Sequence, residues 1–268
     1  MKPPNRNECI SKLEKCLVDV KSWTVQNKLQ LNNSKTEILH VTSRNVKSTP
    51  LTGVQVGDIF VKPSSSARNL GVTIDDKLSM TQHVNIVCRN ATHAIRCIGS
   101  IRHYLDQKTT EKLVHAYVSS RLDQCNSLLY GLPDKELMKL QRVQNTAARL
   151  VTRSKKHDSI SKIMRDLHWL PIGKRIIYKI CLITYKSLHG LAPMYISDLI
   201  KPYNPYRSLR SSTHNLVKPP LRRPRTAYGR RSFEEAAYKE WNTLPTQIRQ
   251  APSINVFKKQ LKTFLFDH

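Results

Sequence analysis

The spacing between apolar residues changes near residue 77 of this 268-residue chain. Before that point, apolar residues alternate with polar ones, as in VQVGDIFV (residues 54–61). Afterwards they recur every three or four residues, as at Val84, Val87, Ala91, Ala94, Ile98 and Ile101. Alternation is typical of strands with one buried face, and the longer period is typical of helices with one buried stripe. The sequence therefore predicts an α+β fold that is mainly α, with a small sheet region followed by a helical body.

The first 76 residues are expected to hold one helix and a small antiparallel sheet. The helix is predicted over residues 7–28, with a buried face formed by Ile10, Leu13, Leu17 and Val20. Asn32, Asn33 and Ser34 are turn formers that end this first segment. The extended pieces are predicted as a strand from Lys35, a hairpin over residues 54–61 that turns at Gly57-Asp58, and a third piece over residues 68–75.

The rest of the chain is expected to be helical, with one interruption. Helices are predicted over residues 80–105, 108–122, 134–152, 159–169 and 174–189. Asp106 is predicted to cap the second of them, in which Leu113, Ala116 and Tyr117 face inward. Residues 201–231 are rich in Pro and Arg and predict an exposed basic loop, after which a compact helical segment closes the chain.

The balance of charge points to a polyanionic partner. Lys and Arg number 45 against 19 Asp and Glu, which gives a formal net charge of +26. Such an excess destabilises a compact chain through self-repulsion, and a bound polyanion relieves it. Nucleic acid is the first expectation, an anionic membrane surface the second, and an acidic protein the third.

Hydropathy and cysteine usage indicate an intracellular protein, in the nucleus or the cytoplasm. No apolar run reaches the roughly 20 residues that a membrane-spanning helix needs, so no transmembrane segment is expected, and nucleic acid rather than a membrane is the expected partner. The N-terminal residues lack the apolar core of a signal peptide. Six cysteines without a CxxC motif favour reduced thiols, and the His and Cys residues between positions 83 and 103 lack the spacing of a zinc site.

Dispersed segments resemble one known family: the C-terminal part of the reverse transcriptase of jockey-like non-LTR retrotransposons (LINEs). The segments include LEKCLVDVKSWTVQNKLQLNNSKTEILH, RNLGVTIDDKLSM, SSRLDQCNSLLYGLP, LQRVQNTAARLV and LHWLPIGKRIIYKICLITYKSLHGLAPMYISDLI. The resemblance implies a palm remnant over residues 1–76 and a helical thumb-like or connection region over residues 77–200. It also implies that residues 201–231 are a basic loop and that residues 232–268 form a C-terminal helical segment.

The resemblance also implies that this chain lacks catalytic activity. Such polymerases hold Mg²⁺ on palm aspartates that belong upstream of Trp23, and the sequence does not contain them. The pair Asp75-Asp76 occupies the position of a later palm motif, LGVxID, and is interpreted as a turn at a strand end. Lys35, in the KTE motif, resembles a lysine near the phosphates of the incoming nucleotide, and a solvated strand-edge lysine is the alternative. No cofactor is expected in this chain.

Nucleic-acid binding without sequence specificity is the activity that remains. Two segments free of acidic residues are the predicted contacts with RNA or DNA phosphates: Arg142, Arg149, Arg153, Lys155 and Lys156 in the first, and Arg222, Arg223, Arg225, Arg230 and Arg231 in the second. Two alternatives stay open. The chain is a structural module that pairs with a full-length polymerase, or it is the product of a decayed reading frame.

Overall fold

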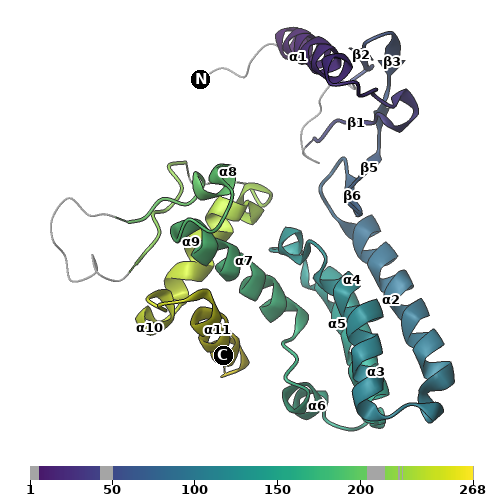
Figure 1. Cartoon of the computed structure of the whole chain (residues 1–268), viewed down its shortest axis with the longest axis vertical. Coiled ribbons are helices and arrows are strands. Elements are labelled where there is room, and N and C mark those ends of the chain that lie inside the picture. Colours follow the sequence, from purple (N-terminus) through teal and green to yellow (C-terminus); the bar gives the residue numbers. More distant parts are fainter. Residues whose placement is uncertain (1–5, 43–50, 204–214, 223, 225, 268) are drawn as a thin grey trace. The chain divides into compact units, whose positions relative to one another are not determined.

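A computed structural model describes residues 6–42, 51–203, 215–222, 224 and 226–267. The chain divides into two compact units, Met1–His83 and Val84–His268. Short strands occur in the first unit, and helices dominate the second (Figure 1). The predicted class, α+β and mainly α, is therefore confirmed. No helix in the described ranges is long and apolar enough to cross a membrane.

The first unit begins with one long helix that packs on a hairpin. Helix α1 (Arg6–Gln26) lies against strand β2 (Val54–Val56), where Glu14 accepts a hydrogen bond from the Gln55 backbone N at 3.1 Å. The predicted buried face of this helix is only partly buried, because Leu13 is 45% and Val20 is 41% exposed. The reason is that strands of two to four residues cover too little of the helix surface.

The strands form three separate pairs rather than one antiparallel sheet. The elements are η1 (Asn33–Lys35), β1 (Ile38–Leu39), β2, β3 (Ile59–Val61), β4 (Pro63–Ser64), β5 (Ser66–Asn69) and β6 (Val72–Asp75). The predicted hairpin is confirmed as β2–β3, with Val54 opposite Val61. The pair β1–β4 is parallel, which corrects the expectation of a purely antiparallel remnant. A long connection, which includes the β2–β3 hairpin, separates these two strands and permits parallel pairing.

The predicted extended piece over residues 68–75 is a second hairpin. Strands β5 and β6 pair antiparallel, with Asn69 opposite Val72. The chain reverses at Leu70 and Gly71, whose φ angles are +48° and +84°. A turn with two positive φ angles suits glycine well but leucine poorly, so the sequence offered a weak turn signal here.

The second unit is a set of helices with short connections. Its elements are α2 (Thr81–Ile101, which begins in the first unit), η2 (Arg102–Tyr104), α3 (Gln107–Val114), η3 (His115–Ser119), α4 (Ser120–Asp123), η4 (Asn126–Leu129), α5 (Asp134–Thr152), α6 (Ile160–Asp166), α7 (Ile172–Leu188), α8 (Met194–Ser197), η6 (Gly229–Arg231), α9 (Phe233–Thr243), α10 (Thr246–Arg249) and α11 (Ile254–Asp267). All five predicted helices of this region are present. The predicted cap of α3 is confirmed, because Asp106 accepts a 2.8 Å hydrogen bond from the Thr109 N.

Element η3 is a π-helical turn that joins α3 to α4. It changes which residues face the core: Val114 and Val118 are fully buried, and Tyr117 is 53% exposed. The predicted inward positions Ala116 and Tyr117 are therefore wrong, and Leu113 is only half-buried. A π turn holds more residues than an α turn, so positions spaced by four stay aligned over successive turns. An α-helical period of 3.6 does not foresee this shift.

Aromatic packing forms the centre of the C-terminal helices. Tyr185 on α7 stacks on Phe257 of α11 with ring centroids 4.4 Å apart, and Trp241 on α9 lies 5.7 Å from Phe257. All three side chains are at most 1% exposed. The Tyr185 hydroxyl donates to the Ala251 O at 3.0 Å, and the Trp241 Nε1 donates to the Asn215 O at 2.7 Å. The polar ends of these rings are thus satisfied inside an apolar core.

One point of the described part of residues 201–231, at Val217, is anchored to this core, while most other described residues of this span are exposed. Val217 is 3% exposed, and the Asn242 side chain bonds both its N and its O, at 3.0 and 2.9 Å. A β-bridge pairs Pro202 with Val217. The burial of Val217 could not be predicted from the sequence, because a single buried valine among prolines and arginines produces no periodic pattern.

Candidate nucleic-acid interface

The C-terminal end of α5 is held by an arginine from outside the predicted set. The Arg102 guanidinium donates to the carbonyl O atoms of Leu150, Val151 and Leu105, at 2.9, 2.8 and 2.6 Å. The carbonyls of Leu150 and Val151 lie in the last turn of α5 and have no partner inside the helix, and Leu105 follows η2. Burial, followed by the charge of Arg153, lowers the pKa of Arg102. Arg102 therefore joins the end of α5 to the segment after α2 through hydrogen bonds, and it contributes positive charge to the end of α5.

Two of the predicted arginines stabilise the turn that follows α5. Arg149 donates to the backbone O atoms of Lys155 and Lys156, each at 3.3 Å. Arg153 adopts a left-handed conformation with φ of +55° and donates to the Arg102 O at 3.1 Å. Both guanidinium groups are hydrogen-bonded to neutral carbonyls rather than to carboxylates. They therefore stabilise the turn without having their positive charge offset by these contacts.

The other three predicted cations are exposed and unpaired. Arg142, Lys155 and Lys156 form no side-chain hydrogen bond or ion pair within the part of the chain that the structure describes. The turn is shaped instead by Asp158, which accepts a 2.6 Å hydrogen bond from the Lys155 backbone N. A helix C-terminus favours nearby cations, so the dipole accounts for part of this cluster. Free ammonium groups at a rigid turn are also suitable contacts for phosphates.

The second predicted segment is divided by the structure. Arg222 and Arg230 are exposed, and Arg231 donates to the Tyr130 O at 3.3 Å. Arg231 also packs closely on Gly131, where an added Cβ would lie 2.8 Å from the Arg231 Cγ. Arg223 and Arg225 lie outside the described residues. Within the described part, the structure therefore leaves two arginines of this segment available for a ligand.

Lys35 and Asp75 lie in the first unit and have different environments. Lys35 ends the short η1 turn with an exposed side chain, and its backbone N donates to the Asn32 Oδ1 at 3.2 Å. The Asp75 carboxylate accepts from the backbone N atoms of Met80, Ser79 and Lys77, at 2.7, 2.9 and 3.1 Å, and from the Ser79 hydroxyl. Burial by itself raises the pKa of Asp75, but these hydrogen bonds outweigh it and lower the pKa.

The Asp75 geometry is that of a turn at a strand end. Both carboxylate oxygens are engaged with donors of the loop that leads into α2, which leaves poor access for a metal ion. Among the described residues, no cluster of three or more His, Cys, Asp or Glu side chains is arranged to hold a metal. The Asp75 carboxylate therefore serves the turn and is not placed as a metal ligand.

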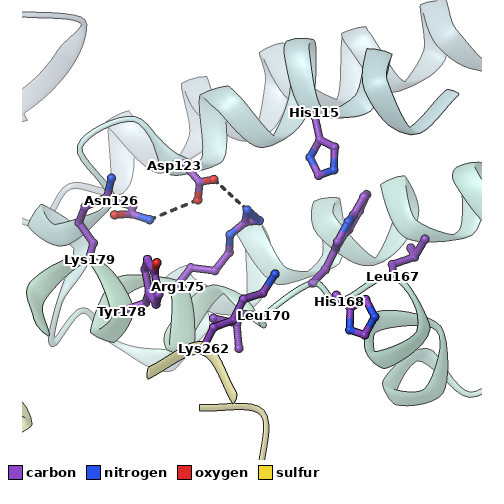
Figure 2. A pocket seen from close by; sticks show the side chains of 11 residues that line it. His115, Asp123, Asn126, Leu167, His168, Leu170, Arg175, Tyr178, Lys179 and Lys262 are labelled. Carbon is purple, nitrogen blue, oxygen red and sulfur yellow. Dashed lines mark hydrogen bonds and ion pairs between the residues drawn. The ribbon is translucent and has the colours of Figure 1, made fainter. Parts of the chain in front are cut away.

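A cavity of about 350 Å³ lies in the second unit (Figure 2). Asp123 and Asn126 line it from the end of α4 and the start of η4, and Arg175 and Lys179 line it from α7. Lys262 approaches from α11. The Arg175 Nη2 donates to the Asp123 Oδ2 at 2.8 Å, and the Asn126 Nδ2 donates to the Asp123 Oδ1 at 3.3 Å. Burial raises the pKa of Asp123 more than the charges of Arg175 and Lys179 lower it.

Sequence reasoning missed both Arg102 and the cavity. Arg102 begins η2, directly after α2, and its spacing of four residues from the buried Ile98 was a signal that this arginine is buried. The cavity offered no such signal, because 52 residues separate Asp123 from Arg175. Comparisons with protein-family models, with curated proteins and with solved structures found no match to this chain.

Proposed function

We propose that this chain binds RNA or DNA without sequence specificity, through phosphate contacts made by the turn after α5. The observation that carries the proposal is a set of exposed, unpaired cations: Lys155 and Lys156 at that turn, and Arg142 in the middle of α5 itself. Phosphate contacts release counterions and supply most of the affinity in such binding. The formal net charge of +26 favours the same class of ligand. Arg222 and Arg230 form a second, smaller contact surface.

We further propose that the chain derives from the reverse transcriptase of a jockey-like non-LTR retrotransposon. The resemblance of its segments to the palm end and thumb of that family supports this origin, and the α+β class is compatible with it. The engaged carboxylate of Asp75 supports the inference that the chain does not transfer nucleotides. Purified protein should therefore extend a primer no better than a no-enzyme control with Mg²⁺ or Mn²⁺, and template-dependent extension would contradict this inference.

A salt titration tests the binding surface. If each of the three cations contacts one phosphate of single-stranded RNA, the log–log salt slope should decrease in magnitude by roughly 2 units in the variant R142A/K155A/K156A. The matched control is K108A/K239A/K259A, which removes the same charge from exposed positions on α3, α9 and α11. Equal slopes for these two variants would show that charge alone, and not this turn, determines binding.

The arginine segment is tested in the same way. For the five-fold Arg→Ala variant at positions 222, 223, 225, 230 and 231, the log–log salt slope on single-stranded RNA should decrease in magnitude by at most roughly 3.5 units. We expect a smaller change, because Arg231 bonds the Tyr130 backbone. An unchanged slope would exclude this segment from the interface. Substituting one RNA sequence for another should have little effect, since phosphates carry no sequence information.

A protein-interaction module is the second candidate, and one observation favours it. Helix α1 exposes Leu13, Val20 and Trp23 along one side, with exposed fractions of 45, 41 and 58%. Exposed apolar stripes of this kind mark contact surfaces with other proteins. Sedimentation velocity of the wild type and of L13S/W23S tests whether a second copy of the chain occupies this stripe. Identical monomeric behaviour of both proteins at micromolar concentrations would exclude such self-pairing.

A further inference from the structure

The cavity between α4, α7 and α11 contains more positive than negative charge. Three cationic side chains line it, Arg175, Lys179 and Lys262, against the single carboxylate of Asp123. Two histidines, His115 and His168, lie at its other side (Figure 2). Pockets that bind small molecules hold about 300–1,000 Å³. The cavity volume of about 350 Å³ therefore suits a single compact anionic group.

Two residues that line this cavity each have a buried polar atom without a partner in the described part of the chain. They are the Arg175 Nη1, a donor, and the Asn126 Oδ1, an acceptor. The identity of the Asn126 oxygen follows from its other amide atom, which must be the nitrogen because it donates to the Asp123 carboxylate. Leaving a buried polar group unpaired destabilises a protein. Two such atoms on residues that line one cavity favour a ligand that supplies an acceptor and a donor.

We propose that this cavity binds a phosphate monoester or inorganic phosphate. The anionic oxygens accept from the Arg175 Nη1 and from the ammonium groups of Lys179 and Lys262. A phosphate monoester titrates near pH 6, so in mildly acidic solution a large fraction carries one hydroxyl. That hydroxyl donates to the Asn126 Oδ1. The same chemistry is present in inorganic phosphate, in a free nucleotide and at the 5′ end of an oligonucleotide.

Sulfate is the comparison ligand that tests whether the bound phosphate donates a hydrogen bond to Asn126. It has the tetrahedral shape of phosphate but carries no proton at pH 6, so it cannot donate to the Asn126 Oδ1. At constant ionic strength and pH 6, inorganic phosphate should raise the thermal midpoint of the full chain in a saturable way, and sulfate should raise it less. Equal effects of the two anions, or an effect without saturation, would overturn the proposal.

Variants assign the effect to the cavity. K179A/K262A should weaken phosphate binding at least roughly ten-fold, because it removes two charged donors. The matched control K135A/K259A removes two exposed lysines that do not line the cavity and should bind as the wild type does. Phosphate affinity that is equal in the two double variants would overturn the proposal. R175K retains the charge but loses the planar fork of donors. It therefore tests the contribution of the Arg175 guanidinium to phosphate binding with a conservative substitution.

The source of the phosphate is assigned by comparing oligonucleotide ends. A 5′-phosphorylated RNA that binds the wild type more tightly than the same RNA with a 5′-hydroxyl, and that loses this advantage in K179A/K262A, identifies a nucleic-acid end as the ligand. If the two RNAs bind equally while inorganic phosphate still saturates the cavity, the ligand is a free phosphate compound. Using 5′-hydroxyl RNA in the salt titrations of the proposed binding surface keeps the test of that surface separate from the test of the cavity.

Discussion

The two units of this chain bury their apolar residues to different degrees. In the second unit, Trp241, Tyr185 and Phe257 pack together with at most 1% exposure. In the first unit, the buried apolar residues are small or flexible, as at Val54, Val72 and Met80, and Trp23 remains 58% exposed. Long helices with continuous stripes enclose one another, but strands of two to four residues do not enclose a helix. The comparison indicates that the second unit carries most of the stability of the chain.

Two tryptophans, one in each unit, provide the largest test of this difference. Trp241→Ala should destabilise the second unit by about 3–5 kcal/mol, because it opens a large cavity and leaves the Asn215 O without its donor. Trp23→Ala should change stability by less than about 0.5 kcal/mol, because the ring is largely in solvent. Denaturant unfolding followed by circular dichroism measures both values. Similar losses for the two variants would remove the distinction between the units.

Polar contacts should show the same difference on a smaller scale. Arg102→Ala in the second unit should cost about 2–3 kcal/mol, because buried carbonyls at the end of α5 lose their donor. Lys21→Ala in the first unit removes the 3.0 Å ion pair with Asp58 and should cost at most about 0.5 kcal/mol. The Asp58 side chain is 91% exposed, so solvent already screens this pair. A loss of 2 kcal/mol for Lys21→Ala would show that the first unit depends on its surface charges.

The third comparison concerns pH and lies within the first unit. Hydrogen bonds lower the pKa of Asp75 in the folded chain below its ordinary value of 3.8. The carboxylate therefore stabilises the fold above pH 3.8, and this contribution disappears as the pH falls through the lower, folded value. Asp75→Asn should cost about 1 kcal/mol at pH 7 and flatten the acid limb of the stability curve. Asp58→Asn, at an exposed position, is the control and should leave that limb unchanged.

The helices were predictable because long periodic stripes report directly on burial. Helix α5 spans 19 residues, and its buried positions Leu140, Val143 and Ala147 follow the predicted period. The β5–β6 hairpin was not predictable in this way, because Leu70 adopts a positive φ that leucine rarely takes. Short strands contain too few residues to display a period, so their pairing depends on contacts that lie far apart in the sequence.

The candidate sites were predictable only where charge clusters along the chain. Arg142, Lys155 and Lys156 stand out in the sequence because no acid lies between them. The sequence could not show that the neighbouring Arg149 and Arg153 bond backbone carbonyls. The sequence alone does not distinguish an arginine that stabilises the fold from one that binds a ligand. Their roles differ only in what the guanidinium group meets in three dimensions.

The π turn between α3 and α4 makes this segment sensitive to length. A π turn is an α-helix with one inserted residue, so a single-codon deletion among residues 115–119 would restore an α-helix. Each helical residue adds a rotation of about 100° and a rise of about 1.5 Å. After such a deletion, Val114 and Leu122 would no longer face the same core, and Asp123 would turn away from Arg175. Insertions and deletions here should therefore be tolerated far less than substitutions at its exposed positions.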